Sequence, residues 1–203
     1  MQDMTCSTFL QALASKAPTP GGGGAAAFTG ALGAALGAMV ANLTLGKQKY
    51  AAVQDDIERL EGQCRILGTE MMDLIEADAK GFQPLADAYK IPRTRENRDI
   101  LLQKAQEEAC QAPLAIMRKG LEGLALQQEL AEKGTVMAVS DVGAGVQLFR
   151  SAILAASLNV YINTRTMKDR QAAARLKEMA ELIEKDSIVL ADHIYDTVRR
   201  RLQ

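Results

Sequence analysis

A long stretch without charge dominates the pattern of hydrophobic and polar positions along this chain. No charged side chain occurs between Lys16 and Lys47, and Ala, Leu and Met predominate over residues 25–45. These residue types favour a helix over a strand, because they lose little side-chain freedom in a helix. Gly46 follows the last apolar residue, where helices commonly end. The pattern predicts a central helix that is apolar all round and therefore buried on all sides.

Small residues recur along one face of this expected helix. Gly30, Gly33, Gly37 and Ala41 are spaced so that they form a single stripe. Each internal glycine costs about 1 kcal/mol relative to Ala. A helix that keeps three of them is expected to need the missing side chains, since a stripe of small residues lets another backbone come close.

A glycine-rich turn leads into the helix. Pro18 and Pro20 are followed by four consecutive glycines: Gly21, Gly22, Gly23 and Gly24. Such glycines expose backbone N–H groups at a helix N-terminus, where the helix dipole favours an anion. We interpret the segment as a phosphate-loop-like turn and as a candidate ligand site. It is neither a Walker A motif nor a dinucleotide fingerprint, because the required glycine and lysine spacing and the preceding strand are absent.

Amphipathic patterns predict further helices along the rest of the chain. We expect a short helix within residues 1–17, long helices over 49–88 and 95–132, a nearly charge-free helix capped by Ser140, and a charged helix over 167–203. Pro84 and Pro113 should kink or end the two long helices. The predicted fold class is all-α, a single domain over residues 1–203 built as an elongated bundle of about six helices.

The second charge-free helix changes the expected assembly. Between Val142 and Asn163 the only charged side chain is Arg150. Two such helices carry more apolar surface than one small chain covers, so we expect a homodimer with two-fold symmetry. A membrane span over residues 25–45 is the alternative by length alone. Asn42, Thr44 and the weak hydrophobicity of Ala and Gly favour a buried helix instead.

Composition and charge narrow the possible partners. The chain has 203 residues, of which 48% are hydrophobic and 4% aromatic, with a formal net charge of −1. This balance predicts no nucleic-acid or membrane partner. Cys6, Cys64 and Cys110 are odd in number and widely spaced, so we expect neither a disulfide framework nor a metal site. With no Lys/Arg-led signal segment, a cytoplasmic location is expected.

Few polar residues accompany the apolar helices, and these are the candidates for chemistry. Asp78 and Asp141 near one pocket would suit proton transfer, one as base and one as acid. Alternatively, Asp78 lies on a solvated face and Asp141 complements a helix dipole. Lys47 ends the charge-free run, where it is either functional or a cation at a helix C-terminus. Metal-ligand spacing is absent.

Two asparagines share one face of the second charge-free helix. Asn159 and Asn163 are four residues apart, so both either bind the amide edge of a heterocycle or cross-link helices. The single histidine, His193, lies in the charged last helix and is expected at the surface. These residues alone do not name a substrate.

Several segments of the chain carry a resemblance to a known family. The segment APTPGGGGAAAFTGALGAALGAMVANLTLGKQKY resembles the signature of the formiminotetrahydrofolate cyclodeaminase family, which includes stand-alone methenyltetrahydrofolate cyclohydrolases. The resemblance continues through DAKGFQPLADAYKIPR, QAPLAI and AVSDVGAG to NVYINT, in the expected order. It implies an all-helical, dimeric protein that uses a tetrahydrofolate derivative as substrate and needs no other cofactor.

The family resemblance implies one of two reactions. In the first, N10 of 5-formiminotetrahydrofolate attacks the amidine carbon and ammonia leaves, which gives 5,10-methenyltetrahydrofolate. In the second, water opens the methenyl bridge to give 10-formyltetrahydrofolate. We expect the first, with the second or a non-catalytic folate-binding module as alternatives. The partner would be a reduced folate, with or without a polyglutamate tail.

The resemblance also implies roles for individual residues. Asp78 and Asp141 take acid, base or pterin-binding roles, and Lys47 with the glycine turn binds anionic parts of the folate or polarises the reacting carbon. The remaining expected lining residues are Asn42, Tyr50, Asn159 and Asn163. One departure concerns residues 134–137, where Gly-Thr-Val-Met stands in place of one or two expected asparagines. An apolar pair there would remove a group that orients substrate.

Overall fold

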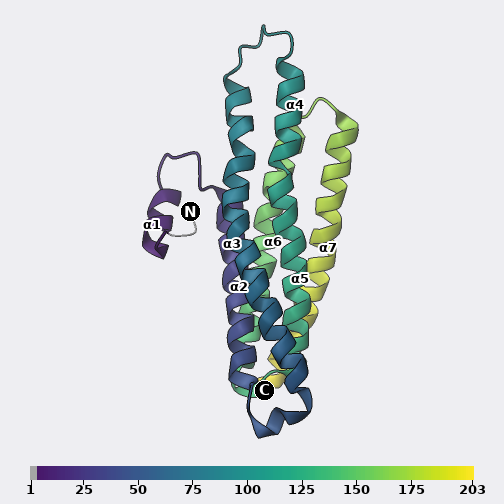
Figure 1. Ribbon diagram of the computed structural model, residues 1–203. Coiled ribbons are helices and arrows are strands. Elements are labelled where there is room, and N and C mark those ends of the chain that lie inside the picture. Colours follow the sequence, from purple (N-terminus) through teal and green to yellow (C-terminus); the bar gives the residue numbers. More distant parts are fainter. Residues whose placement is uncertain (1–3) are drawn as a thin grey trace.

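The computed structural model describes residues 4–203, so the first residues of the helix expected within 1–17 lie outside the described part. The described chain folds into an elongated bundle of α-helices without a strand (Figure 1). The helices are α1 Cys6–Leu13, α2 Gly22–Thr44, α3 Gln54–Lys90, α4 Arg98–Ala109, α5 Gln111–Lys133, α6 Val139–Arg165 and α7 Arg170–Arg201. The all-α prediction is confirmed.

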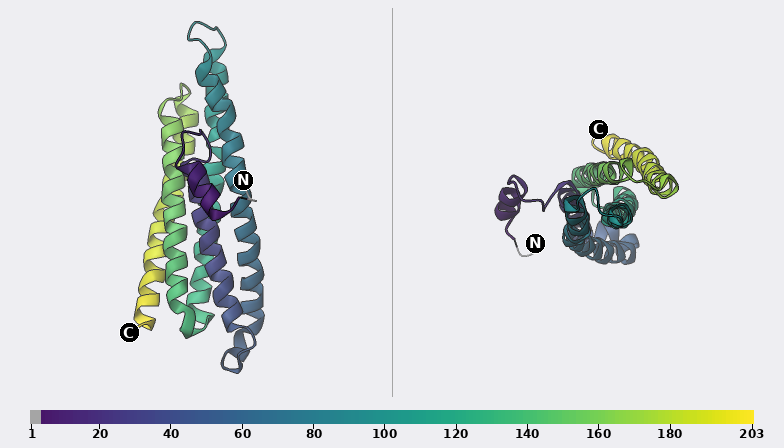
Figure 2. Two further views of the ribbon diagram at one scale, coloured as in Figure 1. Left: turned by 90° about the vertical axis from the view of Figure 1, so that its left-hand side faces the viewer. Right: turned by 90° about the horizontal axis from the view of Figure 1, so that it is seen from above.

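Helix α2 is central, because it contacts α3, α5 and α6 at once. Helix α7 covers the opposite side of α5 and α6, and the α3–α4 hairpin projects beyond the rest of the bundle (Figure 1). Helix α1 stands away from the bundle, joined to it by the segment before α2 (Figure 2). It is capped by the Thr5 hydroxyl and anchored by Phe9, whose ring lies 5.2 Å from that of Phe28.

The glycine-rich segment differs from the expected separate turn. Gly21 is the N-cap of α2, and the next three glycines already form its first turn. Gly46 follows the helix with a φ of +73°, a left-handed conformation that suits glycine, so the predicted end is confirmed. A short 3₁₀ turn, Gln48–Val53, separates it from α3.

Three further boundaries differ from the sequence prediction. The helix expected over 95–132 is interrupted at Cys110, and Pro113 lies in the first turn of α5, where its missing N–H is tolerated. Helix α3 continues through Pro84 to Lys90. Ser140 does not cap α6, which begins one residue earlier after the 3₁₀ turn Val136–Ala138.

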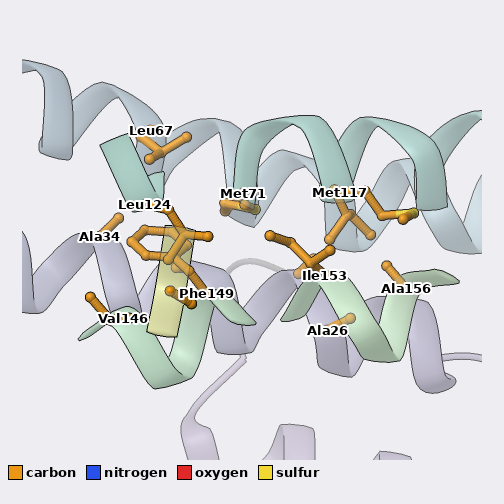
Figure 3. Packing of buried hydrophobic residues seen from close by; sticks show 14 of the residues in the cluster. Ala26, Ala34, Leu67, Met71, Met117, Leu124, Val146, Phe149, Ile153 and Ala156 are labelled. Carbon is orange, nitrogen blue, oxygen red and sulfur yellow. The ribbon is translucent and has the colours of Figure 1, made fainter. Parts of the chain in front are cut away.

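The glycine stripe of α2 marks the tightest contacts of the core, as expected. A Cβ built on Gly33 would lie 3.1 Å from the Phe149 ring and 3.2 Å from the carbonyl oxygen of Gly145 on α6. Similarly, Gly30 makes room for Met71 of α3. Figure 3 shows Phe149 on α6, among the large side chains that pack into this core. Close packing therefore depends on missing side chains in α2.

The outer side of the two apolar helices is not covered. Both α2 and the segment Val136–Arg165 are long and apolar enough to span a membrane, and 56% and 44% of their most apolar stretches are buried in the bundle. These proportions also fit core helices that leave one face open. The expectation that α2 is buried on all sides is therefore wrong for a single chain, since Leu32, Met39 and Leu43 are 39–46% exposed.

We expect Gly33→Leu to destabilise the protein by about 1–3 kcal/mol, because the new side chain meets the Phe149 ring and the α6 backbone. Gly62→Ala is the matched control, since a Cβ at Gly62 meets no atom within 4 Å. That change should stabilise by about 0.5–1 kcal/mol. Urea denaturation at one fixed protein concentration measures both, and wild-type stability in Gly33→Leu would contradict the packing argument.

Candidate active site

A cavity of about 220 Å³ lies at the N-terminal end of α2. It brings together four of the predicted features: the glycine turn, Asp78, Asn159 and Asn163. These residues come from α2, α3 and α6, which the glycine-lined core holds side by side. Phe82, Ala109 and Ile162 supply apolar walls. The cavity is therefore the part of the predicted site that one chain assembles by itself.

Asp78 faces the first turn of α2 so closely that no side chain fits between them. A Cβ built on Gly23 would lie 2.1 Å from Asp78 Oδ1. The backbone N–H of Gly24 donates a hydrogen bond to the Asp78 carboxylate. The anion at this helix N-terminus is thus the chain's own carboxylate.

The environment of Asp78 suits proton transfer. Burial raises the pKa of Asp78, and the hydrogen bond from Gly24 offsets this only in part. A carboxylate is desolvated here without a cationic partner among the groups that act on its pKa. A raised pKa brings a carboxyl group closer to the range in which it both takes up and returns protons.

The two asparagines use their amide nitrogens within the fold. Asn159 Nδ2 donates to the Ala155 carbonyl at 3.1 Å, and Asn163 Nδ2 donates to the Ala109 carbonyl at 3.3 Å. Asn163 therefore cross-links α6 to α4, one of the two roles expected for it. Because the nitrogens are engaged, the amide oxygens are the groups available to accept hydrogen bonds from a ligand.

The structure does not bring the remaining candidates to this cavity. Lys47 and Tyr50 follow the other end of α2, which lies about 35 Å away at 1.5 Å per residue. Asp141 is in the first turn of α6 at that same far end. Asn42 donates to the Ala38 carbonyl at 2.9 Å and to Glu61 Oε1 at 3.0 Å. Within one chain, these residues belong to a second group.

Lys47 and Tyr50 of this second group are linked by a residue that sequence reasoning missed. Thr135 is 2% exposed, its N–H donates to Thr44 Oγ1 at 2.9 Å, and its hydroxyl lies 3.4 Å from Lys47 Nζ. Tyr50 accepts a hydrogen bond from the Val136 N–H at 3.1 Å. Hydrogen bonds from Thr135 and Val136 lower the pKa of Tyr50. An isolated threonine after a helix end gives no periodic signal, and only the Gly134–Met137 departure marked this segment.

Cys64 and His193 do not line the cavity, whereas Cys110 lies beside it, next to Ala109 and hydrogen-bonded to Asn163. Burial raises the pKa of Cys64 and of Cys110 to about 12, so both remain protonated thiols at neutral pH. His193 is exposed on α7, as expected. Among residues 4–203, no group of three or more His, Cys, Asp or Glu side chains lies close enough to hold a metal ion.

The fold is shared with a known all-helical enzyme. The crystal structure of formiminotetrahydrofolate cyclodeaminase from Thermotoga maritima matches it with a TM-score of 0.86 and 26% sequence identity. The match covers 99% of this chain and 96% of that one. Agreement over nearly the full length shows that the whole bundle is shared.

Relatives in sequence agree with the structural match. Methenyltetrahydrofolate cyclohydrolase of Methylorubrum extorquens is 39% identical, over 98% of this chain and 97% of that protein. Formimidoyltransferase-cyclodeaminase of Rattus norvegicus is 29% identical over 82% of this chain, and the chain matches 32% of the rat protein's length. The family model described as formiminotransferase-cyclodeaminase matches residues 5–182. The chain belongs to the formiminotransferase-cyclodeaminase family, as its sequence motifs predicted, and is an enzyme of the cyclodeaminase or cyclohydrolase kind.

The raised pKa of Asp78 predicts a specific pH dependence of stability. The folded protein holds the Asp78 proton more tightly than the unfolded chain does. The stability that depends on this proton is therefore fully present below the unfolded pKa of about 3.9. It is lost as the pH rises through the higher folded pKa. We expect Asp78→Asn to be more stable than wild type at neutral pH, with the difference vanishing below about pH 4.

Asp87→Asn, on the same helix, is the control, and it should change the stability in the opposite direction. Lys90 holds the pKa of Asp87 below its ordinary value, so removing this exposed carboxylate should lower stability slightly at neutral pH. Urea denaturation over a series of pH values measures both variants against wild type. A neutral-pH stability of Asp78→Asn below that of wild type would contradict the assignment of Asp78 as a desolvated carboxylate.

Proposed function

We propose that this enzyme hydrolyses 5,10-methenyltetrahydrofolate to 10-formyltetrahydrofolate. One observation carries the proposal: a desolvated carboxylate, Asp78, lies against a helix N-terminus in a cavity with two amide oxygen acceptors. The match to the cyclohydrolase of Methylorubrum extorquens over nearly the full length of both chains supports the choice of reaction. It favours the second of the two reactions expected from the sequence.

Asp78 fits the charge of this substrate. The methenyl bridge carries a positive charge shared between N5 and N10, and a carboxylate in a site of low dielectric attracts such a cation strongly. Binding the cation would in turn favour the ionised form of Asp78. Substrate binding would therefore keep Asp78 in the ionised form that acts as the base.

The reaction transfers a proton twice, first from water to Asp78 and then from Asp78 to N5. Water adds to the methenyl carbon while Asp78 accepts one of its protons, which leaves a neutral tetrahedral intermediate. The bond from carbon to N5 then breaks, N5 gains a proton and the remaining hydroxyl becomes the formyl carbonyl. One proton of the water ends on N5 and the other is released, so a single carboxyl group serves as base and then as acid.

The asparagines suit the pterin part of the molecule. A reduced pterin presents several N–H donors on one side, and the oxygens of Asn159 and Asn163 lie four residues apart on α6 as acceptors. Both amide atoms of Asn159 lie within 3.7 Å of the position of a Cβ on Gly22. A side chain at Gly22 would therefore narrow the cavity where the ring would lie.

Cyclisation of 5-formiminotetrahydrofolate with release of ammonia is the second candidate. The Thermotoga maritima structure, which bears that activity in its name, shares the whole bundle. The same carboxyl group would protonate the departing ammonia and accept the proton of N10. The methenyl compound is the product of this cyclisation and the substrate of the hydrolysis, so one site can bind it in either reaction.

Kinetics on purified protein test the proposal. Wild type should accelerate the decay of the near-ultraviolet absorbance of 5,10-methenyltetrahydrofolate over a buffer blank, and Asp78→Asn should lower kcat/KM by about 100-fold or more. Asp192→Asn is the control, because this exposed carboxylate pairs with Arg150, does not line the cavity and should leave the rate unchanged.

Two results would contradict the proposal. Wild-type protein that releases ammonia from 5-formiminotetrahydrofolate but does not hydrolyse the methenyl compound would establish the second candidate instead. Full activity in Asp78→Asn would remove Asp78 from the chemistry.

A further inference from the structure

The break between α4 and α5 leaves a backbone carbonyl in need of a donor beside the cavity. In a continuous helix the carbonyl of Ala109 accepts a hydrogen bond from the N–H of the residue four positions later. That residue is Pro113, which has no N–H. Ala109 itself lines the cavity that contains Asp78. The sequence therefore places an acceptor without its helical donor at the wall of the candidate site.

The side chain of Asn163 supplies the donor. Its Nδ2 lies 3.3 Å from the Ala109 carbonyl oxygen and donates to it from α6. A second side-chain amide acts at the same break, where Gln111 Nε2 donates to the Glu107 carbonyl at 3.0 Å. Buried backbone carbonyls are nearly always paired, because an unpaired one costs free energy. Side-chain amides therefore complete the backbone hydrogen bonding where α4 gives way to α5.

Cys110 engages the second hydrogen of the Asn163 amide group. Burial raises the pKa of the Cys110 thiol to about 12, and a hydrogen bond with Asn163 acts in the opposite direction. A partner that favours the charged form of a thiol donates to the sulfur, so Asn163 presents an N–H to Cys110 Sγ. An asparagine side chain has two N–H donors, and both are then engaged. The amide oxygen is the atom left to face the cavity.

Asn159 is held less firmly than Asn163. Its Nδ2 donates at 3.1 Å to the Ala155 carbonyl, which belongs to the same helix and already has a regular helical donor. Asn163 instead donates to another helix, to a carbonyl whose helical donor is missing. The two asparagines of the cavity therefore differ in rigidity, although they occupy equivalent positions in the pattern of α6.

We infer that Pro113 and Cys110 are positioning residues, which lock the Asn163 amide with its oxygen toward the substrate. Asn163 is then a fixed acceptor that selects an N–H group of the bound pterin and disfavours a ligand with a lone pair at that place. A preformed acceptor needs no further ordering when the ligand binds. The step from this geometry to substrate binding rests on the proposed function, because that function names the ligand.

Pro113→Ala tests the role of the missing N–H. The new N–H at position 113 can donate to the Ala109 carbonyl, so Asn163 loses the acceptor that depends on it. We expect KM for 5,10-methenyltetrahydrofolate to rise about 3–10-fold, the size expected for one oriented hydrogen bond. The value of kcat should stay within about 2-fold of wild type, because Asp78 is unchanged.

Variants of Cys110 provide a second test that leaves Pro113 in place. Cys110→Ala removes the acceptor for the second amide hydrogen and should also raise KM. Cys110→Ser keeps an acceptor of similar size and should restore KM toward the wild-type value. Cys64→Ala is the matched control, because Cys64 is an equally buried thiol that does not line the cavity. It should lower stability as Cys110→Ala does and leave KM unchanged.

Two kinetic results would overturn the inference. Wild-type KM in both Pro113→Ala and Cys110→Ala would show that substrate binding does not use the lock. An equal rise of KM in Cys110→Ala and Cys64→Ala would show a general effect of packing in place of a specific one on Asn163.

Hydrogen exchange of the side-chain amides tests the lock without reference to activity. The chain has four asparagines, Asn42, Asn97, Asn159 and Asn163, so ¹⁵N-asparagine labelling gives four NH₂ signal pairs in an NMR spectrum. Asn159→Ala and Asn163→Ala identify the two pairs of interest. We expect the Asn163 hydrogens to exchange with water more slowly than those of Asn159, and this difference to disappear in Pro113→Ala. Equal exchange in wild type would overturn the inference.

The two kinds of measurement separate this inference from the proposed function. Slow exchange at Asn163 in a protein that does not hydrolyse the methenyl compound would support the lock and contradict the proposed function. Hydrolysis by wild type together with wild-type KM in Pro113→Ala and Cys110→Ala would support the proposed function and contradict the lock.

Discussion

The bundle depends on how closely α2 approaches its neighbours. At Gly33 the helix lies against the Phe149 ring and the backbone of α6, and the Gly33 carbonyl accepts a hydrogen bond from Gln127 of α5 at 3.0 Å. Three helices are fixed relative to one another at this point, because a side chain at Gly33 would meet backbone atoms. Together with Met71 of α3 packed at Gly30, these contacts fix where α3 and α6 present Asp78 and Asn159.

The same absence of side chains serves the chemistry at the N-terminus of α2. Gly23 lets the Asp78 carboxylate approach the helix backbone, and the Gly24 N–H donates to it. This hydrogen bond offsets only part of the cost of burying a charge, so the pKa of Asp78 remains raised. A carboxylate whose burial weakens the fold is a sign that it is kept for its reactivity.

Local signals in the sequence predicted much of this structure. The end of α2 and its glycine stripe followed from propensity and spacing, whereas the grouping of Asp78 with the asparagines came from the family resemblance. The break at Cys110 was missed, because Pro113 was the only visible signal and tertiary packing placed the interruption earlier. The separation of the glycine turn from Lys47 could have been predicted from the sequence, because one helix of this length already sets them about 35 Å apart.

Helix α2 lacks charge on two faces for two different reasons. Its inner face needs small residues because α3, α5 and α6 approach it closely. Nothing within the described chain explains its outer face, whereas the outer face of α3 carries ion pairs such as Arg65 with Glu61. The homodimer expected from the sequence would cover this outer face.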